Sequence, residues 1–375
     1  MQAFSDQLGL RCVLMRGGTS KGPFFLAEDL PPPGPRRDAA LLRLMGALEP
    51  RRIDGIGGID SLTNKVAIIS RSDRPDVHVD YLFAQICVHK NTIDYSVNCG
   101  NMLAAVGPFA IDEGLVPASG ASTEVAIFNV NTGKRIVATV CTRDGRAVYA
   151  GDAAIDGVAG TAAPVWLRFC DVAGAKTGKL LPTGNAVDRM EGLEVSCIDA
   201  AVPMAIVEAA ALGMTGYETA EAINAQPELL ARVERVRCAA GRAMGLGDVS
   251  RLEMPKLVTV AQARSGGTVA ARYFMPYTCH TSFAVTGAVC LGAAAQVPGS
   301  VAARVAGAAA AGKVAIEHPA GILHVDIDAF QGAGGVDIRS ASLLRTARRL
   351  FAGTVYFPES TLEALHTESA KEVHA

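Results

Sequence analysis

The feature that most constrains this chain is a pattern that occurs twice, about half a chain length apart. Strand-like runs lead into a polar turn, and the turn leads into a helix of small residues. The turn and helix span residues 96–111 in the first unit and residues 278–289 in the second. We therefore expect an α+β protein with two similar halves, and we find no short repeat of the solenoid kind.

The composition limits the classes of function. The chain has 375 residues, of which 50% are hydrophobic, so two domains of ordinary size are expected. The formal net charge of −2 excludes the basic stripe of a nucleic-acid-binding protein. The longest apolar stretch, residues 284–297, is shorter than the roughly 20 residues that span a membrane. The amino terminus lacks the pattern of a secretory signal, so we expect a cytoplasmic protein without a membrane span.

The cysteines and histidines give no sign of a metal site. The nine cysteines include no CxxC pair, which argues against a disulfide framework and against a zinc site. The seven histidines are dispersed, without HxxxH or HxH spacing. Most of the cysteines are expected to be small buried core residues.

The expected elements follow from the periodicity of apolar residues. Strands are predicted at residues 10–15, 65–70, 77–88, 165–172, 202–207, 257–260 and 269–274. Hairpins are predicted at residues 123–142 and 313–327, with turns at 131–133 and 319–321. Helices are predicted at residues 38–45, with Asp38 as the cap, at 219–244 as one long amphipathic helix, and from Cys99 to 111, limited or kinked by Pro108.

Cys99 is the first candidate for catalysis. It lies at an expected helix start and is framed by Asn98, Gly100 and Asn101. The positive end of the backbone dipole would stabilise a thiolate there, which makes the residue a candidate acid or base. The alternative is a buried cysteine like the other eight, and the local pattern leaves both open.

Lys65 is the second candidate. It opens an apolar strand-like run, where desolvation of the charged form would favour a neutral amine that accepts a proton near neutral pH. On the pattern alone, a lysine that reaches solvent at a strand end is the favoured alternative.

A glycine-containing loop at residues 16–22 is a candidate anion site. It lacks the GxxxxGK[ST] spacing of a phosphate loop. Its backbone amides, the hydroxyls of Thr19 and Ser20, and the cations Arg16 and Lys21 suit carboxylates. A plain surface turn explains these residues equally well.

His280 precedes the second helix together with Ser282. It could act as an acid or base or contact an anion, although a lone histidine is more often structural. No GxSxG, GxGxxG or HExxH motif supports a hydrolase, a dinucleotide enzyme or a metalloprotease.

Taken together, the motifs resemble those of the methylaconitate isomerase and 4-oxalomesaconate tautomerase family, in order over residues 10–357. They are residues 15–22 (MRGGTSKG), 53–58 (IDGIGG), 65–67 (KVA), 98–101 (NCGN), 106–110 (VGPFA) and 286–289 (TGAV). Four further segments resemble the 4-oxalomesaconate branch, namely residues 79–85 (VDYLFAQ), 149–157 (YAGDAAIDG), 181–188 (LPTGNAVD) and 344–348 (LRTAR).

The resemblance implies a diaminopimelate epimerase-like fold with two halves, residues 1–184 and 185–375. Each half would be a β-barrel-like sheet around a central helix, with the active site in the cleft between them. Lys65 and Cys99 match the catalytic lysine and the cysteine of the family's CGN motif. From the loop and the two helix starts we expect substrate-binding residues at Arg16, Gly18, Thr19, Ser20, Asn98, Gly100, Asn101, His280 and Ser282.

The epimerases have a second catalytic cysteine at the start of the second helix, and this chain departs from that pattern. In the register set by residues 286–288, the equivalent position falls near Ala284, whereas Cys279 and Cys290 are out of register. A racemase with two thiols is therefore disfavoured, and Lys65 is expected to supply the second catalytic group.

The activity implied is that of a cofactor-independent isomerase of 4-oxalomesaconate in bacterial breakdown of gallate and protocatechuate. Lys65 would be the base and Cys99 the acid, or the reverse, and the reaction would be a keto-enol or a 1,3-allylic proton shift. The partner would be a small unsaturated di- or tricarboxylate, with no metal, and a homodimer is one option for assembly. The alternatives are an aconitate or methylaconitate cis-trans isomerase and a non-catalytic carboxylate-binding accessory protein.

Overall fold

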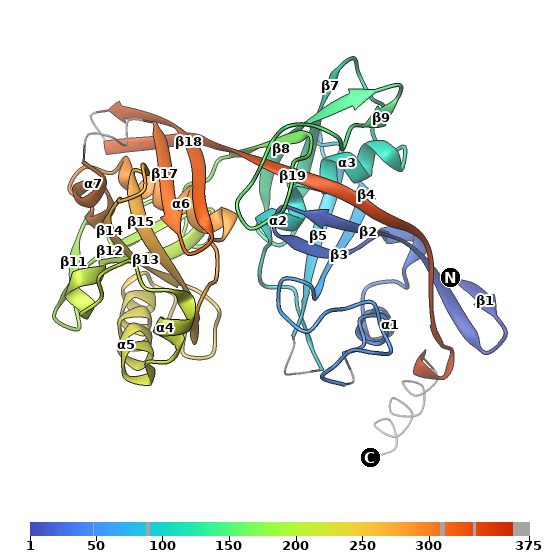
Figure 1. Ribbon diagram of the computed structural model, residues 1–375, viewed down its shortest axis with the longest axis horizontal. Helices are drawn as coiled ribbons and strands as arrows, with labels where there is room; N and C mark the ends of the chain where they lie inside the picture. The colour runs from blue at the N-terminus through green and yellow to red at the C-terminus, as the bar shows by residue number, and fades with distance from the viewer. Residues whose placement is uncertain (48, 88–90, 308–311, 333–334, 363–375) are drawn as a thin grey trace.

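The computed structural model describes residues 1–47, 49–87, 91–307, 312–332 and 335–362. Two halves lie side by side, and in each a curved sheet surrounds buried helical segments (Figure 1). One end of the strand predicted at residues 77–88 lies outside the described residues. In the part of the chain that is described, no helix is long and apolar enough to cross a membrane.

The first half comprises the elements up to β10. Its strands are β1 Gln2–Phe4, β2 Gln7–Gly17, β3 Ser20–Leu26, β4 Lys65–Arg71, β5 Val79–Ile86, β6 Ile93–Asp94, β7 Ser122–Asn129, β8 Lys134–Arg143, β9 Arg146–Ala147 and β10 Pro164–Cys170. Its helices are η1 Ala27–Asp29, α1 Pro35–Leu44, α2 Gly100–Leu103 and α3 Val106–Asp112.

The second half comprises the elements from β11 to β18. Its strands are β11 Asp188–Met190, β12 Leu193–Ala200, β13 Val202–Glu208, β14 Lys256–Gln262, β15 Val269–Met275, β16 Thr278–Cys279, β17 Lys313–His318 and β18 Gly321–Gly332. Its helices are η2 Ala209–Leu212, α4 Ala220–Asn224, α5 Pro227–Ala243, α6 Val285–Ala295 and α7 Val301–Ala306. The last strand, β19 Gly335–Pro358, belongs to both halves.

The two halves repeat one order of strand pairing. In the first half, β2 and β3 are antiparallel, β3 and β4 parallel, β4 and β5 antiparallel, β5 and β7 parallel, and β7 and β8 antiparallel. The strands β12, β13, β14, β15, β17 and β18 pair in the same order and with the same directions. The expectation of two similar halves is therefore confirmed, and Lys65 and Lys256 open equivalent strands.

The strand β19 joins the halves. It pairs with β18, then with β10 through residues 340–346, and finally with β2 through residues 347–358. Since β10 also pairs with β8, the strands of the first half form a closed circuit. Figure 1 shows β19 in red, crossing from the second half to the first. The exact division at residues 184 and 185 stays a prediction.

Small residues allow each sheet to close around its helix. Every residue of α6 is buried, and most of them are alanine, glycine or valine. A Cβ atom on Gly292 would lie 2.8 Å from a methyl group of Val325, and one on Gly287 would overlap the ring of Tyr273. The sheet can therefore approach the helix closely only because glycine occupies these positions.

The prediction of one continuous helix at residues 219–244 is wrong. The segment forms two helices, α4 and α5, because Pro227 cannot continue a helix but is well accommodated in the first turn of a new one. The side chain of Thr219 caps α4 by accepting a hydrogen bond from the backbone N–H of Ala222.

The prediction that Asp38 caps the first helix is also wrong. The helix α1 begins at Pro35, with Gly34 as its N-cap residue, so Asp38 lies one turn inside. There its carboxylate accepts a hydrogen bond of 2.6 Å from the hydroxyl of Tyr95, which ties the helix to the segment before Cys99. The proline at the first position sets the start of this helix.

Candidate active site

A cavity of about 340 Å³ lies between the two halves. Its wall combines the turn between β2 and β3, the start of α2, a loop of the first half, the turn into α6, and parts of β17, β18 and β19. The lining residues are Thr19, Asn101, Ala154, Ile155, Asp156, Ser282, Phe283, His318, Ile322, Leu323, His324, Leu344 and Arg345. Three of the expected substrate-binding residues therefore line the cavity, namely Thr19, Asn101 and Ser282.

The starts of α2 and α6 meet beside this cavity. Cys99 is the N-cap residue of α2 and Ala284 that of α6, as the register predicts. A Cβ atom on Gly100 would lie 2.6 Å from Cβ of Val285, so only glycine allows the two helix starts to meet. The contact places Cys99 at the junction of the halves.

The helix that follows Cys99 is shorter than expected. It ends at Leu103, and α3 begins only at Val106, so the prediction of one helix to residue 111 is wrong. Pro108 lacks an N–H group and its ring would clash with the carbonyl of Ala104, which explains the break. The backbone dipole at Cys99 is consequently that of a single turn, weaker than the sequence interpretation assumed.

The Cys99 thiol is held in a polar corner of the first half. The residue is 8% exposed, and its sulfur lies 4.0 Å from the hydroxyl oxygen of Ser20. The hydroxyl of Tyr81 donates a hydrogen bond of 3.3 Å to the Cys99 carbonyl. These contacts fix the backbone at the thiol and leave the hydroxyl of Ser20 as its neighbour.

The loop predicted at residues 16–22 is a tight hairpin turn, and it brings Thr19 to the cavity. Gly18 has a φ angle of +51°, and a Cβ atom there would overlap the side-chain oxygen of Asn101. The Asn101 amide donates a hydrogen bond of 3.0 Å to the hydroxyl of Thr19. The hairpin and the start of α2 therefore form one surface.

Arg16 is turned toward the backbone. Its guanidinium donates hydrogen bonds to the carbonyl of Gly18 at 2.8 Å and to the carbonyl of Thr346 at 3.1 Å. Burial and the positive charge of Arg348 lower the pKa of Arg16. The structure thus shows Arg16 tying the hairpin to β19, while its contact with substrate stays a prediction.

Lys65 is buried without an acidic partner among the described residues. It is 8% exposed, and its ammonium donates a hydrogen bond of 2.9 Å to the side-chain oxygen of Gln85. The Gln85 amide donates to the carbonyl of Asn64 at 2.8 Å, which fixes the orientation of its oxygen. The ring of Phe83 lies 5.2 Å from the ammonium nitrogen. The described contacts of the Lys65 ammonium are therefore with neutral groups.

Gln85 was not among the expected site residues. The sequence did mark it, because Gln85 is the last residue of the segment at residues 79–85 that resembles the 4-oxalomesaconate branch. In the structure, Gln85 pairs directly with Lys65 across β4 and β5. A residue opposite a catalytic lysine in an antiparallel pair is its natural contact.

His280 faces the site from the second half. Its Nδ1 atom accepts a hydrogen bond of 2.8 Å from the backbone N–H of Ser282, so the neutral ring carries its proton on Nε2. Burial and the positive charges of Lys65, His318 and Lys256 lower the pKa of His280 to about 4. His280 is therefore a neutral hydrogen-bond donor at pH 7.

Two further basic residues of the second half were not among the expected site residues. Lys256 opens β14 as Lys65 opens β4; it is 6% exposed, and its ammonium donates to the carboxylate of Glu253 at 2.8 Å. Burial lowers the pKa of Lys256. His318 ends β17 and lines the cavity. The equivalence of the two lysines could have been read from the sequence, whereas nothing local marks His318.

The two buried histidines make stability sensitive to acid. Burial, with the charges of Arg345 and Arg272, also lowers the pKa of His318 to about 4, although Asp156 acts in the opposite direction. Both rings titrate near 6.5 when unfolded, so the unfolded chain binds more protons between pH 6.5 and 4, and stability falls as the pH falls. The expected loss is roughly 3 kcal/mol per histidine.

This loss can be measured by urea unfolding from pH 7 to pH 4.5, comparing the wild type with His318→Gln. Carboxylates also titrate in this range, so the informative quantity is the difference between the two proteins. We expect a shallower pH dependence in the variant. An identical pH dependence would contradict a neutral buried His318.

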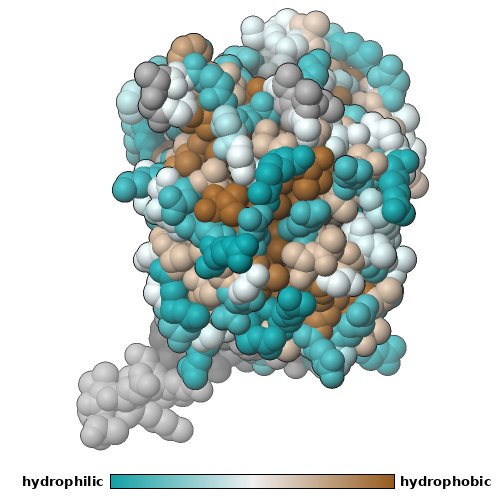
Figure 2. Space-filling model, turned by 90° about the vertical axis from the view of Figure 1, so that its left-hand side faces the viewer, coloured by the Kyte–Doolittle hydropathy of each residue, from teal (hydrophilic) through white to brown (hydrophobic). Residues whose placement is uncertain are grey.

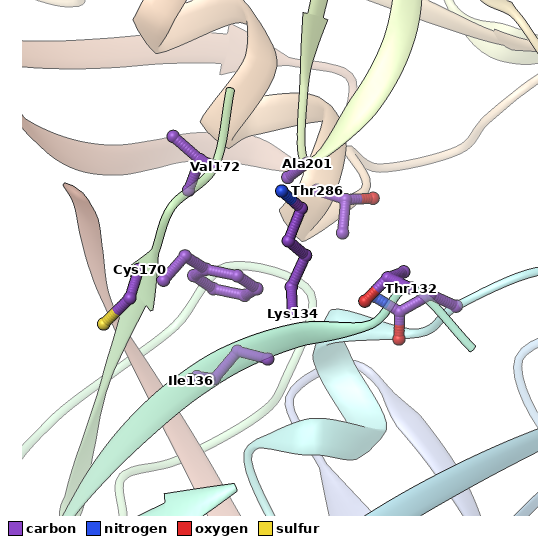
Figure 3. Close-up of a pocket in the computed structure, with 9 residues that line it drawn as sticks. Thr132, Lys134, Ile136, Cys170, Val172, Ala201 and Thr286 are labelled. Carbon is purple, nitrogen blue, oxygen red and sulfur yellow. The ribbon is translucent and has the colours of Figure 1, made fainter. Parts of the chain in front are cut away.

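A second, smaller cavity of about 10 Å³ lies behind Cys99 at the interface of the halves. Figure 3 shows Lys134 extending from its strand toward Ala201 and Thr286. Asn98 also lines this cavity, and its side-chain oxygen accepts a hydrogen bond of 2.6 Å from Asn129. The space suits about one water molecule and excludes a polycarboxylate. The structure therefore places Asn98 away from the large cavity, and its contact with substrate stays a prediction.

The remaining cysteines near the site do not form a second thiol centre. Burial raises the pKa of Cys279 to about 12 and raises that of Cys290 as well. Neither occupies the helix start, which is Ala284. Within the described ranges, no group of three or more His, Cys, Asp or Glu side chains could hold a metal ion.

Comparisons with known proteins agree with this geometry. Residues 7–358 match the family model described as PrpF protein. The chain is 51% identical to the 4-oxalomesaconate tautomerase of Pseudomonas putida, over 95% of this chain and 98% of that protein. It is 50% identical to the (4E)-oxalomesaconate Delta-isomerase of a Novosphingobium species, over 92% and 96%.

Solved structures show the same fold. The crystal structure of a methylitaconate-delta-isomerase matches with a TM-score of 0.81 and 39% identity, over 96% of this chain and 98% of that chain. A hydroxyproline epimerase from Agrobacterium vitis shares the fold alone, with a TM-score of 0.54 and 12% identity over 96% and 95%. The expected epimerase-like α+β fold is confirmed.

Proposed function

This chain belongs to the PrpF protein family and is an isomerase, and we propose that it moves a proton along 4-oxalomesaconate without a cofactor. The observation that carries the proposal is a buried lysine whose ammonium donates to a neutral amide oxygen, in the same half as a thiol at the start of α2, together with a cavity that has a buried arginine on its wall. Lys65 and Cys99 come from the first half, His280 precedes α6 in the second half, and Arg345 lies in β19. Such a site suits a substrate with several carboxylates.

In the proposed mechanism, the neutral amine of Lys65 removes a proton from the carbon next to a carbonyl of the substrate. The C–H bond breaks, its electron pair enters a delocalised dienolate, and the lysine becomes an ammonium. The Cys99 thiol then gives its proton to a carbon or oxygen at another position of the conjugated system. Transfer of the proton from the ammonium back to the thiolate, directly or through water, restores the starting state.

The dienolate intermediate carries additional negative charge, and the groups that stabilise it must interact more strongly with the dienolate than with the substrate. We assign this role to the protonated Lys65, to the Nε2–H group of His280 and to the backbone N–H groups at the start of α6. His280 suits it because its neutral ring donates a hydrogen bond and does not titrate near pH 7.

The two oxalomesaconate enzymes resemble this chain almost equally, yet one is named a tautomerase and the other a Delta-isomerase. We propose that both shifts begin with the same proton abstraction, so the carbon or oxygen that is reprotonated distinguishes them. Isomerisation of aconitate or methylaconitate is the sister activity that the same residues could perform. The proposed setting is the bacterial cytoplasm, during gallate or protocatechuate breakdown.

The experiment is proton NMR of the purified enzyme with 4-oxalomesaconate in deuterated water, with trans-aconitate and 2-methylaconitate in parallel samples. We expect conversion of 4-oxalomesaconate, with deuterium at the newly protonated position of the product and, through return of the proton, at the carbon next to the carbonyl in the remaining substrate. Conversion of the aconitates alone would replace the substrate and keep the site. If none of the three compounds is converted or exchanges a proton, a carboxylate-binding protein becomes the better explanation.

Assembly as a homodimer also stays a proposal. Figure 2 shows the outer face of the second half, where apolar side chains (brown) alternate with polar ones (teal). This face alone does not select a partner, so the oligomeric state is a matter for sedimentation or light scattering.

A further inference from the structure

Arg345 is a buried cation on the wall of the large cavity. It lies in β19, opposite Val165 of β10, and it is 7% exposed. Burial lowers its pKa to about 10, which still leaves the guanidinium charged at neutral pH. A permanent charge in this position needs an explanation, because burial of an ion is costly.

The hydrogen bonds of Arg345 do not supply that explanation. Its Nη1 atom donates only to the carbonyl of the preceding residue, Leu344, at 2.9 Å. Its Nε atom is buried and has no hydrogen-bond partner in the described part of the chain. No carboxylate within the described ranges forms an ion pair with Arg345.

Arg237 shows what a structural arginine looks like in the same protein. It is 0% exposed, and its guanidinium donates to both carboxylate oxygens of Glu234, at 2.6 and 2.7 Å. It also donates to the carbonyls of Val249 at 2.8 Å and Pro255 at 3.2 Å. Arg237 is therefore satisfied by the protein itself, whereas Arg345 is not.

The surroundings of Arg345 point to an anionic ligand. His318 lies close enough for the charge of Arg345 to lower its pKa, and both line the cavity. Asp156 is the only acid among the lining residues that the structure describes, and its carboxylate accepts a hydrogen bond from the backbone N–H of Ile322. The carboxylate of Asp156 thus joins the loop of the first half to the start of β18.

We propose that Arg345 binds a substrate carboxylate that takes no part in proton transfer, and that it thereby selects tricarboxylates over dicarboxylates. This inference rests on the proposed function, because it places the binding residue in the same cavity. A carboxylate facing the guanidinium can accept from Nε and from a terminal nitrogen together, the paired geometry that arginine favours. Lysine offers a single point charge and cannot reproduce that pair.

The test measures binding apart from turnover, with tricarballylate as a tricarboxylate probe and glutarate as a dicarboxylate of the same chain length. Isothermal titration calorimetry compares the full-length wild type with Arg345→Met and Arg345→Lys. We expect Arg345→Met to weaken tricarballylate binding by about 100-fold and to lower the ratio of the two affinities at least tenfold. Arg345→Lys should retain part of the affinity but not the selectivity.

The control is Arg339→Met, which removes an exposed arginine from the same strand and should leave both affinities unchanged. Thermal unfolding without ligand separates binding from a structural role. Removal of an unsatisfied buried cation should leave Tm unchanged or raise it, whereas a structural arginine would show a lower Tm.

The outcomes separate this inference from the proposed function. If Arg345→Met leaves the affinity ratio unchanged, or lowers Tm without changing selectivity, Arg345 is not the selecting residue, even if the enzyme converts 4-oxalomesaconate. If binding of tricarballylate depends on Arg345 but no polycarboxylate is converted, the proposed reaction fails and the binding site stands.

Discussion

Replacement of Lys65 by methionine should lower kcat on 4-oxalomesaconate by about 10³- to 10⁴-fold and abolish deuterium exchange into the substrate. Methionine keeps much of the side-chain length and apolar volume but removes the amine, and its thioether cannot accept the proton. Gln85 holds the lysine through a neutral oxygen, and within the described ranges Lys65 forms no ion pair with a carboxylate that could take over as base. Proton NMR in deuterated water measures conversion and exchange in the same sample.

Lys256→Met is the matched control. Lys256 is equally buried and opens the equivalent strand of the second half, so its removal carries a comparable risk to folding. Its ammonium donates to the carboxylate of Glu253, whereas the ammonium of Lys65 donates to a neutral amide oxygen. We expect this variant to retain exchange and to keep kcat within about tenfold. Equal losses in the two variants would show that Lys65 has no special role as base.

The parts of the fold that the sequence predicts well are those specified by short-range patterns. The run that starts at Lys65 alternates little and is almost wholly buried, as expected of a central strand. The hairpin with its turn at residues 131–133 is found as β7 and β8. The position of Ala284 at a helix start follows from its register with Cys99, because the two halves repeat one topology.

The parts that sequence reasoning missed depend on contacts between distant segments. The strand β19 contains several arginines, which obscure the alternation of buried residues along it. It becomes a strand because it can pair with β18, β10 and β2 at once, and no local window contains that information. Arg345 was overlooked for the same reason, since a guanidinium on an arginine-rich segment looks exposed until β10 covers it.

Most of the site residues were predicted from the hairpin loop at residues 16–22 and from the turns that lead into the two helices. The structure adds the residues that contact them. The hydrogen bond from Lys65 to Gln85 depends on pairing of β4 with β5. The low pKa of His280 comes first from its burial and then from the positive charges of Lys65, His318 and Lys256, which are distant in sequence. Both effects arise from assembly of the cleft, so a sequence identifies the reactive groups more readily than their electrostatic environment.

Replacement of Cys99 by alanine should separate the two proton transfers. With Lys65 intact, the substrate proton can still be removed and returned, so we expect deuterium to enter the substrate while conversion falls about 10²- to 10³-fold. The thiol lies beside the Ser20 hydroxyl at the start of α2, and its loss leaves only water as a weaker donor for the second position. Cys99→Ser provides the control for side-chain size, because a hydroxyl is a poorer acid than a thiol.

The pattern of exchange and conversion assigns the roles. Exchange without conversion in Cys99→Ala, together with neither in Lys65→Met, identifies Lys65 as the base and Cys99 as the acid. The opposite pattern, exchange retained in Lys65→Met and lost in Cys99→Ala, would reverse the two roles and make the thiolate the base. Exchange retained in both variants would mean that neither group removes the proton, and the base would then have to be sought among the groups of the second half that face the cleft.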